Sequence, residues 1–375
     1  MTYHSLVLSS DLRPDFAVLG GGLIGRLIAW RLAGSGHRVA LYESGNADGS
    51  GAAASIAAGM LSPISEAASS EKLIVKLGVA SLELWPKWLD ELPERVFFQK
   101  NGTLVVWHYS DRSEAMLFER RVRENAPTTL FDSSFIPLTS DQINITEPAL
   151  AGRFLRGLLL LCEGQLDNRH ILHSLAVGLA ERGVDIHWNT MIHAYNAPST
   201  HFTIDCRGLG AKTVLPELRG IRGEIARIHA PGIGLTRPVR LLHPRYPLYL
   251  VPKQNDLYVV GATEVESEDM SGVSVRSALE LLSAMFSVHP AFGEARILEW
   301  NTHCRPTLPN HRPAVIWDGA STLIVNGLYR HGFMIGPEIV QITVELAEAM
   351  LCGEVYDEHC FASWRNASRW PELLH

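Results

Sequence analysis

Three glycines and one glutamate near the start of the chain have the spacing of a nucleotide-binding site. Gly20, Gly22 and Gly25 form the pattern G-x-G-x-x-G, and Glu43 follows about 20 residues later. Such glycines allow a tight turn, the close approach of a pyrophosphate to the backbone, and the close packing of a helix on a strand. The carboxylate of Glu43 can accept hydrogen bonds from ribose hydroxyls. The pattern predicts that the chain binds a dinucleotide.

The residues around these glycines have the strand–helix–strand order that such a site requires. Residues 15–19 and 38–42 are predicted as buried strands, and the apolar residues within 27–32 as part of the helix that joins them. The N-terminus of this helix would present free N–H groups and the positive end of its dipole to the phosphates. Residues 44–50 contain no Arg or Lys for a 2′-phosphate, which argues against NADP.

A run of small residues, 45–63, follows the second strand. It consists mainly of Gly, Ala and Ser, whereas most NAD dehydrogenases continue here with another helix and parallel strand. Small residues allow a flat ring system to lie against the backbone, and residues 52–58 would begin a short helix facing the same site. We therefore expect this run to cradle a cofactor, with a flexible surface loop as the alternative.

Two later turns are expected to reach the same crevice. The strand predicted for 202–206 leads into Gly208 and Gly210, and open α/β sheets bind ligands beyond the carboxyl ends of their strands. Farther along, a glycine-rich turn over 327–336 precedes a long helix expected over 338–350.

The intervening chain is typical of β-structure. Residues 223–229, 248–251 and 257–261 are predicted as antiparallel strands. A further hairpin is expected within 96–107, because Asn101-Gly102 favours a two-residue turn.

Composition limits the class of protein. The chain has 375 residues, which is long enough for two lobes with a sizeable core. Its residues are 46% hydrophobic and 19% charged, which is typical of a globular protein. The net charge is −7 without a basic run, so a nucleic-acid partner is not expected. Five cysteines without a C-x-x-C pair favour free thiols in a reducing cytoplasm, and the scattered histidines predict no metal site. Residues 1–14 lack signal-peptide features, and no apolar run is long enough to span a membrane.

Six motifs between residues 15 and 350 together resemble one family of flavoproteins. They are VLGGGLIG…ALYE, GSGAAASIAAGMLSP, GQLDNRHILHSLAVGLAERGV, LYLVPKQNDLYVVGATEVES, CRPTLPNHRPAV and VNGLYRHGFMIGP. The first is shared by many flavoproteins, whereas the combination resembles the D-amino-acid oxidase and sarcosine oxidase group of FAD enzymes. Within that group the chain is most similar to the glycine oxidases of thiamine biosynthesis.

The resemblance implies an α/β (α+β) fold with two interleaved domains. One is a Rossmann-like FAD-binding domain, and the other is a substrate domain built on a large antiparallel β-sheet. The expected ranges are 1–90, 145–220 and 318–375 for the FAD-binding domain, and 91–144 and 221–317 for the substrate domain.

The activity implied is the oxidative deamination of glycine or another small amine or amino acid. A hydride passes from the substrate to non-covalently bound FAD, water hydrolyses the imine, and O2 reoxidises the flavin to give H2O2. The imine would feed thiazole synthesis for thiamine. Some relatives link the flavin to a cysteine near the position of Cys304, which we interpret here as a core thiol. Relatives also assemble as homo-oligomers.

The resemblance also implies roles for individual residues. Arg305 matches the arginine that binds the substrate carboxylate, Tyr249 matches a substrate-side tyrosine, and Arg330 is a second catalytic candidate on the loop under the flavin. Packing within the sheet is a close alternative for Tyr249, and a histidine such as His331 is more often packed than catalytic. The residues expected to contact FAD are Gly20, Gly22, Leu23, Ile24, Gly25, Glu43, Ser44, Ala52, Ala53, Ala58, Gly59, Met60, Gly208, Gly210, Arg305, Arg330, His331, Gly332, Phe333, Met334 and Ile335.

Three other functions fit the same residues. A flavoprotein of this fold could act on a partner quinoprotein and mature its cysteine tryptophylquinone cofactor; a large exposed apolar patch above the site would favour that function. An FAD dehydrogenase could instead pass electrons to a quinone, because we find no counterpart of the lysine with which sarcosine oxidases activate O2. A nucleotide sensor without enzymatic activity is the least favoured.

Overall fold

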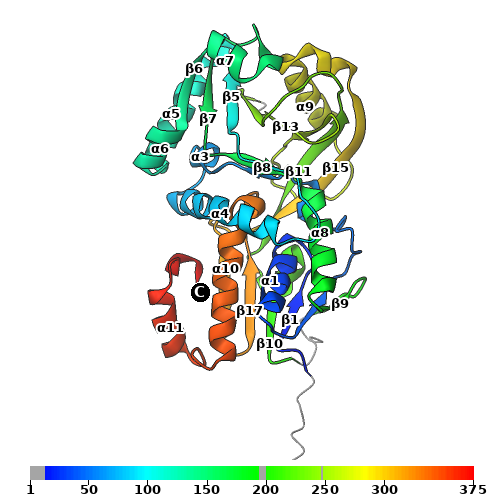
Figure 1. The fold of residues 1–375 in the computed structure, drawn as a ribbon, viewed down its shortest axis with the longest axis vertical. Coiled ribbons are helices and arrows are strands. Elements are labelled where there is room, and N and C mark those ends of the chain that lie inside the picture. Colours follow the sequence, from blue (N-terminus) through cyan, green and yellow to red (C-terminus); the bar gives the residue numbers. More distant parts are fainter. Residues whose placement is uncertain (1–12, 194–199, 246–247) are drawn as a thin grey trace, which may run out of the picture.

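The computed structural model describes residues 13–193, 200–245 and 248–375, and most of its strands form two large sheets that Figure 1 shows one above the other. Among these residues, three further short strands form a third, small sheet. Residues 1–14, which the sequence predicts not to be a signal peptide, lie mainly outside the described residues. In the described part, no helix is both long and apolar enough to cross a membrane.

The lower sheet in Figure 1 is mostly parallel and contains the predicted strand–helix–strand unit. In spatial order its strands are β16 (Ala314–Trp317), β17 (Thr322–Asn326), β10 (Phe202–Asp205), β1 (Phe16–Leu19), β2 (Val39–Tyr42) and β9 (Asp185–His187). The edge strand β16 is antiparallel to β17, and the other neighbours pair in parallel. Parallel strands need a crossover connection, which between β1 and β2 is α1 (Leu23–Gly34).

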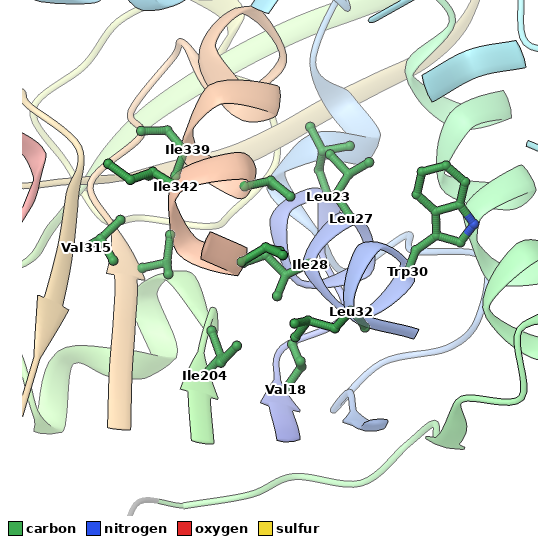
Figure 2. Packing of buried hydrophobic residues seen from close by; sticks show 14 of the residues in the cluster. Val18, Leu23, Leu27, Ile28, Trp30, Leu32, Ile204, Val315, Ile339 and Ile342 are labelled. Carbon is green, nitrogen blue, oxygen red and sulfur yellow. The ribbon is translucent and has the colours of Figure 1, made fainter. Parts of the chain in front are cut away.

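Helix α1 is held by apolar contacts with the sheet and with two further helices, α8 (Asn168–Glu181) and α10 (Gly332–Leu351). Figure 2 shows Ile28 of α1 near Val18 and Ile204 of the strands, with Ile339 and Ile342 of α10 on the other side. All five side chains are buried. This packing fixes the direction in which the N-terminus of α1 points.

The start of α1 also lies very close to the turn that precedes it. A side-chain carbon at Gly25 would lie 1.9 Å from the carbonyl oxygen of Gly20. Gly20 has a φ of +95°, in the left-handed region that favours glycine. This is the close helix–strand packing that the glycine spacing predicts.

The upper sheet has eight strands among the described residues. In spatial order they are β15 (Arg296–Thr307), β11 (Arg219–His229), β14 (Leu257–Gly261), β13 (Leu248–Pro252), β12 (Val239–Leu242), β5 (Thr103–Trp107), β7 (Arg156–Leu160) and β6 (Phe135–Thr139). β12 and β5 pair in parallel, and the other neighbours are antiparallel. Helix α9 (Val275–Val288) packs its apolar face into the core of this sheet. The predicted fold class, a Rossmann-like sheet with a second large sheet, is confirmed.

The hairpin expected at Asn101-Gly102 is wrong. Strand β4 (Phe98–Gln99) pairs with β8 (Gly164–Leu166), whereas β5 pairs with β7 and β12. Each flank of the turn finds a partner far along the chain, so the local turn signal does not decide the pairing. Other connecting elements are β3 (Met60–Leu61), α2 (Ala53–Ile56), α3 (Pro63–Ala67), α4 (Lys72–Asp90), α5 (Arg112–Asn125), α6 (Thr128–Ser134), α7 (Ser140–Thr146) and α11 (Glu358–Ala367).

Two strands lie on the other side of the domain boundaries expected from the sequence. Strand β7 falls within 145–220 but pairs in the upper sheet, and β16 falls within 221–317 but forms the edge of the lower sheet. Their partners are distant in sequence, and spacing alone does not identify them. The division into an FAD-binding and a substrate domain stays a prediction.

Helix α10 begins at Gly332, earlier than the expected start at residue 338. Pro337 lies inside this helix and cannot donate a hydrogen bond to the carbonyl of Phe333. The indole N–H of Trp85, on α4, donates to that carbonyl at 2.9 Å instead. A tertiary contact thus compensates for the proline, and the helix starts within the glycine-rich turn expected over 327–336.

Candidate functional site

A cavity of about 1440 Å³ lies where the two sheets meet. It is lined by residues that follow β1, β2 and β10 in the lower sheet, and by residues of β11, β13 and β15 in the upper sheet. Every residue predicted to contact FAD or substrate lines it, except Gly25, which packs on Gly20, and Ile335, which is buried in the core. The predicted residues in the lining are Gly20, Gly22, Leu23, Ile24, Glu43, Ser44, Ala52, Ala53, Ala58, Gly59, Met60, Gly208, Gly210, Tyr249, Arg305, Arg330, His331, Gly332, Phe333 and Met334.

The glycine turn and Glu43 form one end of the cavity. A side-chain carbon at Gly22 would meet only the Cβ of Ala52, at 3.8 Å, so it would project into open space. Glu43 accepts hydrogen bonds from the backbone N–H groups of Gly21 and, at 2.6 Å, of Gly45, and from the hydroxyl of Ser44 at 3.1 Å. A carboxylate has about four acceptor positions, so Glu43 retains capacity for a ribose hydroxyl. The residues present therefore fit a dinucleotide.

Arg26, which follows Gly25, supports this turn and was not predicted. Its side chain is fully buried. It donates to the carbonyls of Gly21 at 2.6 Å, Ala47 at 2.9 Å and Leu172 at 2.6 Å. Burial lowers the pKa of Arg26 to about 10, so it remains charged at neutral pH. The signal in the sequence was an arginine on a helix face otherwise occupied by apolar residues.

Arg305 presents an unpaired positive charge to the other end of the cavity. It lies on β15, and within the described part of the chain its guanidinium donates only to the carbonyls of Thr263 at 3.1 Å and Arg222 at 3.4 Å. Among the described residues it has no ion-pair partner. A side-chain carbon at Gly223, on the neighbouring β11, would lie 2.2 Å from its Nη2. The glycine therefore provides the space in which the guanidinium lies.

Tyr249 adds a hydroxyl near this charge. It lies on β13 opposite Gly261 of β14, and a side-chain carbon at Gly261 would lie 2.7 Å from its hydroxyl oxygen. Burial raises the pKa of Tyr249, against the lowering effect of Arg305. The phenol therefore stays protonated at neutral pH, as a hydrogen-bond donor.

Arg330 is arranged differently from Arg305, because its charge is already balanced. Its guanidinium contacts Glu66 and Glu264, each at 2.8 Å, and the hydroxyl of Ser69 at 2.6 Å. Arg240 approaches Glu66 as well, at 3.5 Å. Burial alone would raise the pKa of Glu66, but the charges of Arg330 and Arg240 outweigh it and lower the pKa to about 2.

His331 lies beside this cluster at the start of α10. It is 3% exposed, and burial lowers its pKa to about 4, so the ring is neutral at neutral pH. Its Nε2 lies 3.3 Å from the hydroxyl of Ser70, and its Nδ1 lies 3.5 Å from Glu66. The next residues, Gly332 to Met334, form the first turn of α10 and line the cavity. Their free N–H groups favour negative charge there.

Cys304 does not have the environment of a reactive thiol. It is fully buried, and its Sγ donates weakly to the carbonyl of Ser267 at 3.6 Å. Burial raises its pKa, whereas nucleophilic cysteines have a lowered pKa. Cys304 lines the cavity, but its raised pKa fits an unreactive thiol.

Known proteins share this sequence pattern and fold. A family model of FAD dependent oxidoreductases, the DAO family, matches residues 15–346. A protein of Rhizobium etli named as a thiamine biosynthesis oxidoreductase, ThiO, is 40% identical over 321 residues, which cover 85% of this chain and 92% of its own length. A glycine oxidase of Geobacillus kaustophilus is 26% identical over 369 residues, which cover 90% of this chain and 93% of its own length.

Solved structures agree on the fold. The crystal structure of glycine oxidase from Geobacillus kaustophilus superposes with a TM-score of 0.77 at 24% identity, covering 90% of this chain and 95% of its own. An iminodiacetate oxidase from Chelativorans sp. gives a TM-score of 0.72 at 20% identity, covering 92% and 96%. The chain belongs to the family of FAD dependent oxidoreductases, as its six motifs predict, and FAD is its cofactor.

Replacing Gly22 with Val is expected to abolish FAD binding, because the branched side chain would occupy the space that the glycine leaves open. The fold is expected to survive, since the first added carbon meets only Ala52. Flavin absorbance and far-UV circular dichroism of the purified variant test both points. Gly22→Ala should have an intermediate affinity, and a Gly22→Val protein with full flavin content would refute the assignment.

Replacing Glu66 with Gln is expected to lower the free energy of unfolding by about 3 kcal/mol at pH 7. Because the folded pKa of about 2 lies below the ordinary 4.5, this stabilisation is present above pH 4.5 and is lost as the pH falls towards 2. Urea unfolding at pH 7 and pH 3 measures the difference. Glu119→Gln, an exposed carboxylate on α5, is the control. A difference for Glu66→Gln that does not shrink at pH 3 would contradict the ion-pair interpretation.

Proposed function

We propose that this enzyme catalyses the oxidative deamination of glycine or a closely related small amino acid or amine. The observation that carries the proposal is the guanidinium of Arg305, which lines the cavity without a carboxylate partner among the described residues. Such a cation favours an anionic ligand, and a guanidinium binds the carboxylate of an amino acid through two parallel hydrogen bonds. The names of the relatives, ThiO and glycine oxidase, support the same substrate class.

Tyr249 is proposed to hold the same carboxylate. Its protonated hydroxyl would donate to one carboxylate oxygen while Arg305 donates to both. Two groups on one carboxylate restrict its rotation and so orient the carbon that loses the hydride. Orientation of this kind contributes much of the catalysis when the cofactor supplies the chemistry.

Bound FAD supplies the acceptor for the hydride. The residues proposed to hold it are the glycine turn, Glu43, the small residues Ala52 to Met60 and the first turn of α10. We assign no general base, because Glu66 is ion-paired and the amine can enter in its neutral form. The pairing of Arg330 with Glu66 and Glu264 makes it a support of the site, whereas Arg305 remains available to the substrate.

The remaining features of the function are proposed from the resemblance and the names of the relatives. O2 would be the final electron acceptor, giving H2O2. The imine product would serve thiazole synthesis, and the enzyme would be a cytoplasmic homo-oligomer with non-covalent FAD.

One observation favours a partner protein as the substrate instead. Three apolar residues of α9, Val275, Leu279 and Phe286, are 78%, 62% and 53% exposed. Their spacing places them on one face of the helix, and Arg276 and Glu280 of the same helix line the cavity. An exposed apolar stripe beside the site fits contact with another protein.

The experiment that separates these functions is the visible spectrum of the purified flavoprotein on adding glycine without oxygen. Loss of the flavin bands, followed by their return in air, is expected for a glycine oxidase. Bands that persist with glycine, sarcosine and D-alanine would refute the proposal and favour the partner-protein function. Bands that bleach but do not return in air would favour a quinone as acceptor.

Replacing Arg305 with Lys is expected to raise the KM for the amino acid by roughly ten- to hundred-fold, because one charge-assisted hydrogen bond contributes about 1.5–3 kcal/mol. Flavin content should not change. Steady-state kinetics measure the effect, and Arg312→Lys, an exposed arginine paired with Glu71, is the matched control. Unchanged kinetics in Arg305→Lys would disprove its role.

A further inference from the structure

Lys253 is a buried amine that the proposed mechanism does not use. It follows β13 in the upper sheet and is 7% exposed. Its Nζ donates to the backbone carbonyls of Leu166 at 2.7 Å and Ala58 at 2.8 Å, and to the side-chain oxygen of Gln165 at 3.4 Å. An ammonium group has three N–H donors, so the three acceptors match the charged form of the lysine.

The carbonyl of Ala58 belongs to the wall of the cavity, and that of Leu166 supports the wall from behind. Ala58 and Gly59 line the cavity, and Gly59 contacts Leu166 of β8. The Leu166 N–H donates to the Gly59 carbonyl at 2.9 Å. A side-chain carbon at Gly59 would lie 2.3 Å from the Leu166 carbonyl oxygen. Through its hydrogen bonds to Ala58 and Leu166, Lys253 therefore connects the upper sheet to the cavity wall and to β8.

Charged groups surround Lys253 without pairing with it. Among the described residues, no carboxylate forms an ion pair with this amine. Asp167 faces it from the N-terminus of α8, and Arg227 faces it from β11. Beyond them, Arg169 of α8 and Glu299 of β15 pair with each other at 2.6 Å. Burial lowers the pKa of Lys253 to about 7, although Asp167 opposes the shift.

We propose that Lys253 is a positioning residue for the cofactor: its ammonium group fixes the cavity wall at Ala58 and Gly59, and the protein binds FAD tightly only while this amine is protonated. The inference rests on the proposed assignment of that wall to FAD binding. A neutral amine has two donors, and its lone pair then faces one of the three oxygens. The wall is therefore held less firmly, and FAD and the proton bind cooperatively.

The test is a titration of the apoprotein with FAD at pH 6 and pH 9. Flavin fluorescence monitors binding and gives the affinity for FAD at each pH. The wild type is expected to bind FAD about tenfold more weakly at pH 9. Lys253→Met should bind weakly at both pH values. Lys253→Arg keeps its charge at pH 9 and should bind equally at both. Lys76→Met, on the exposed side of α4, is the control and should follow the wild type.

Equal affinity of the wild type at both pH values would overturn the inference, and so would wild-type pH dependence in Lys253→Met. If Lys253→Met does not fold, the profiles of the wild type and of Lys253→Arg decide the question. A wild type with no affinity for FAD at either pH would overturn the proposed function as well, whereas FAD binding that does not depend on pH overturns only the role of Lys253.

Discussion

The close contact between α1 and the turn after β1 is the constraint on which the rest of the site depends. Helix and turn approach each other only because Gly20 and Gly25 have no side chains. The contact brings the first N–H groups of α1 to the cavity and places Gly21 beside the carboxylate of Glu43. The buried guanidinium of Arg26 donates both to the carbonyl of Gly21 in this turn and to the carbonyl of Ala47 in the loop after β2, so it connects the two segments. The position of α1 thus fixes the backbone that faces the nucleotide.

The cavity is lined by arginines that form ion pairs and by Arg305, for which the structure describes no ion pair. Arg330 and Arg240 share Glu66, and such pairs persist because removing one partner leaves a buried charge uncompensated. Arg305 has carbonyl acceptors but forms no ion pair with any residue that the structure describes, so an anion entering the cavity is attracted to it. The upper sheet makes this arrangement possible through two glycines, Gly223 and Gly261, which leave room for the guanidinium of Arg305 and the phenol of Tyr249.

Much of the fold and of the cavity lining could be predicted from the sequence, where the signals were local. The β1–α1–β2 unit follows from glycine spacing and apolar periodicity within 30 residues, and nearly all of the residues expected at the site line the cavity. The failures lie where a distant partner outweighs a local signal. The turn at Asn101-Gly102 joins strands of different sheets, and α10 continues through Pro337 because Trp85 binds the carbonyl of Phe333.

The sequence by itself determined the class of cofactor, the strand–helix–strand unit that receives it, and which arginines were candidates for the substrate. Those conclusions depend on residue types and on spacings of a few residues, which a single chain displays directly. Only the tertiary structure decided which arginine is paired, which lysine is buried, and which carbonyls accept hydrogen bonds from that lysine. These properties depend on groups more than 80 residues apart in sequence, such as Lys253 and Leu166 or Arg330 and Glu66, because folding alone brings their charges and acceptors together and removes the water between them.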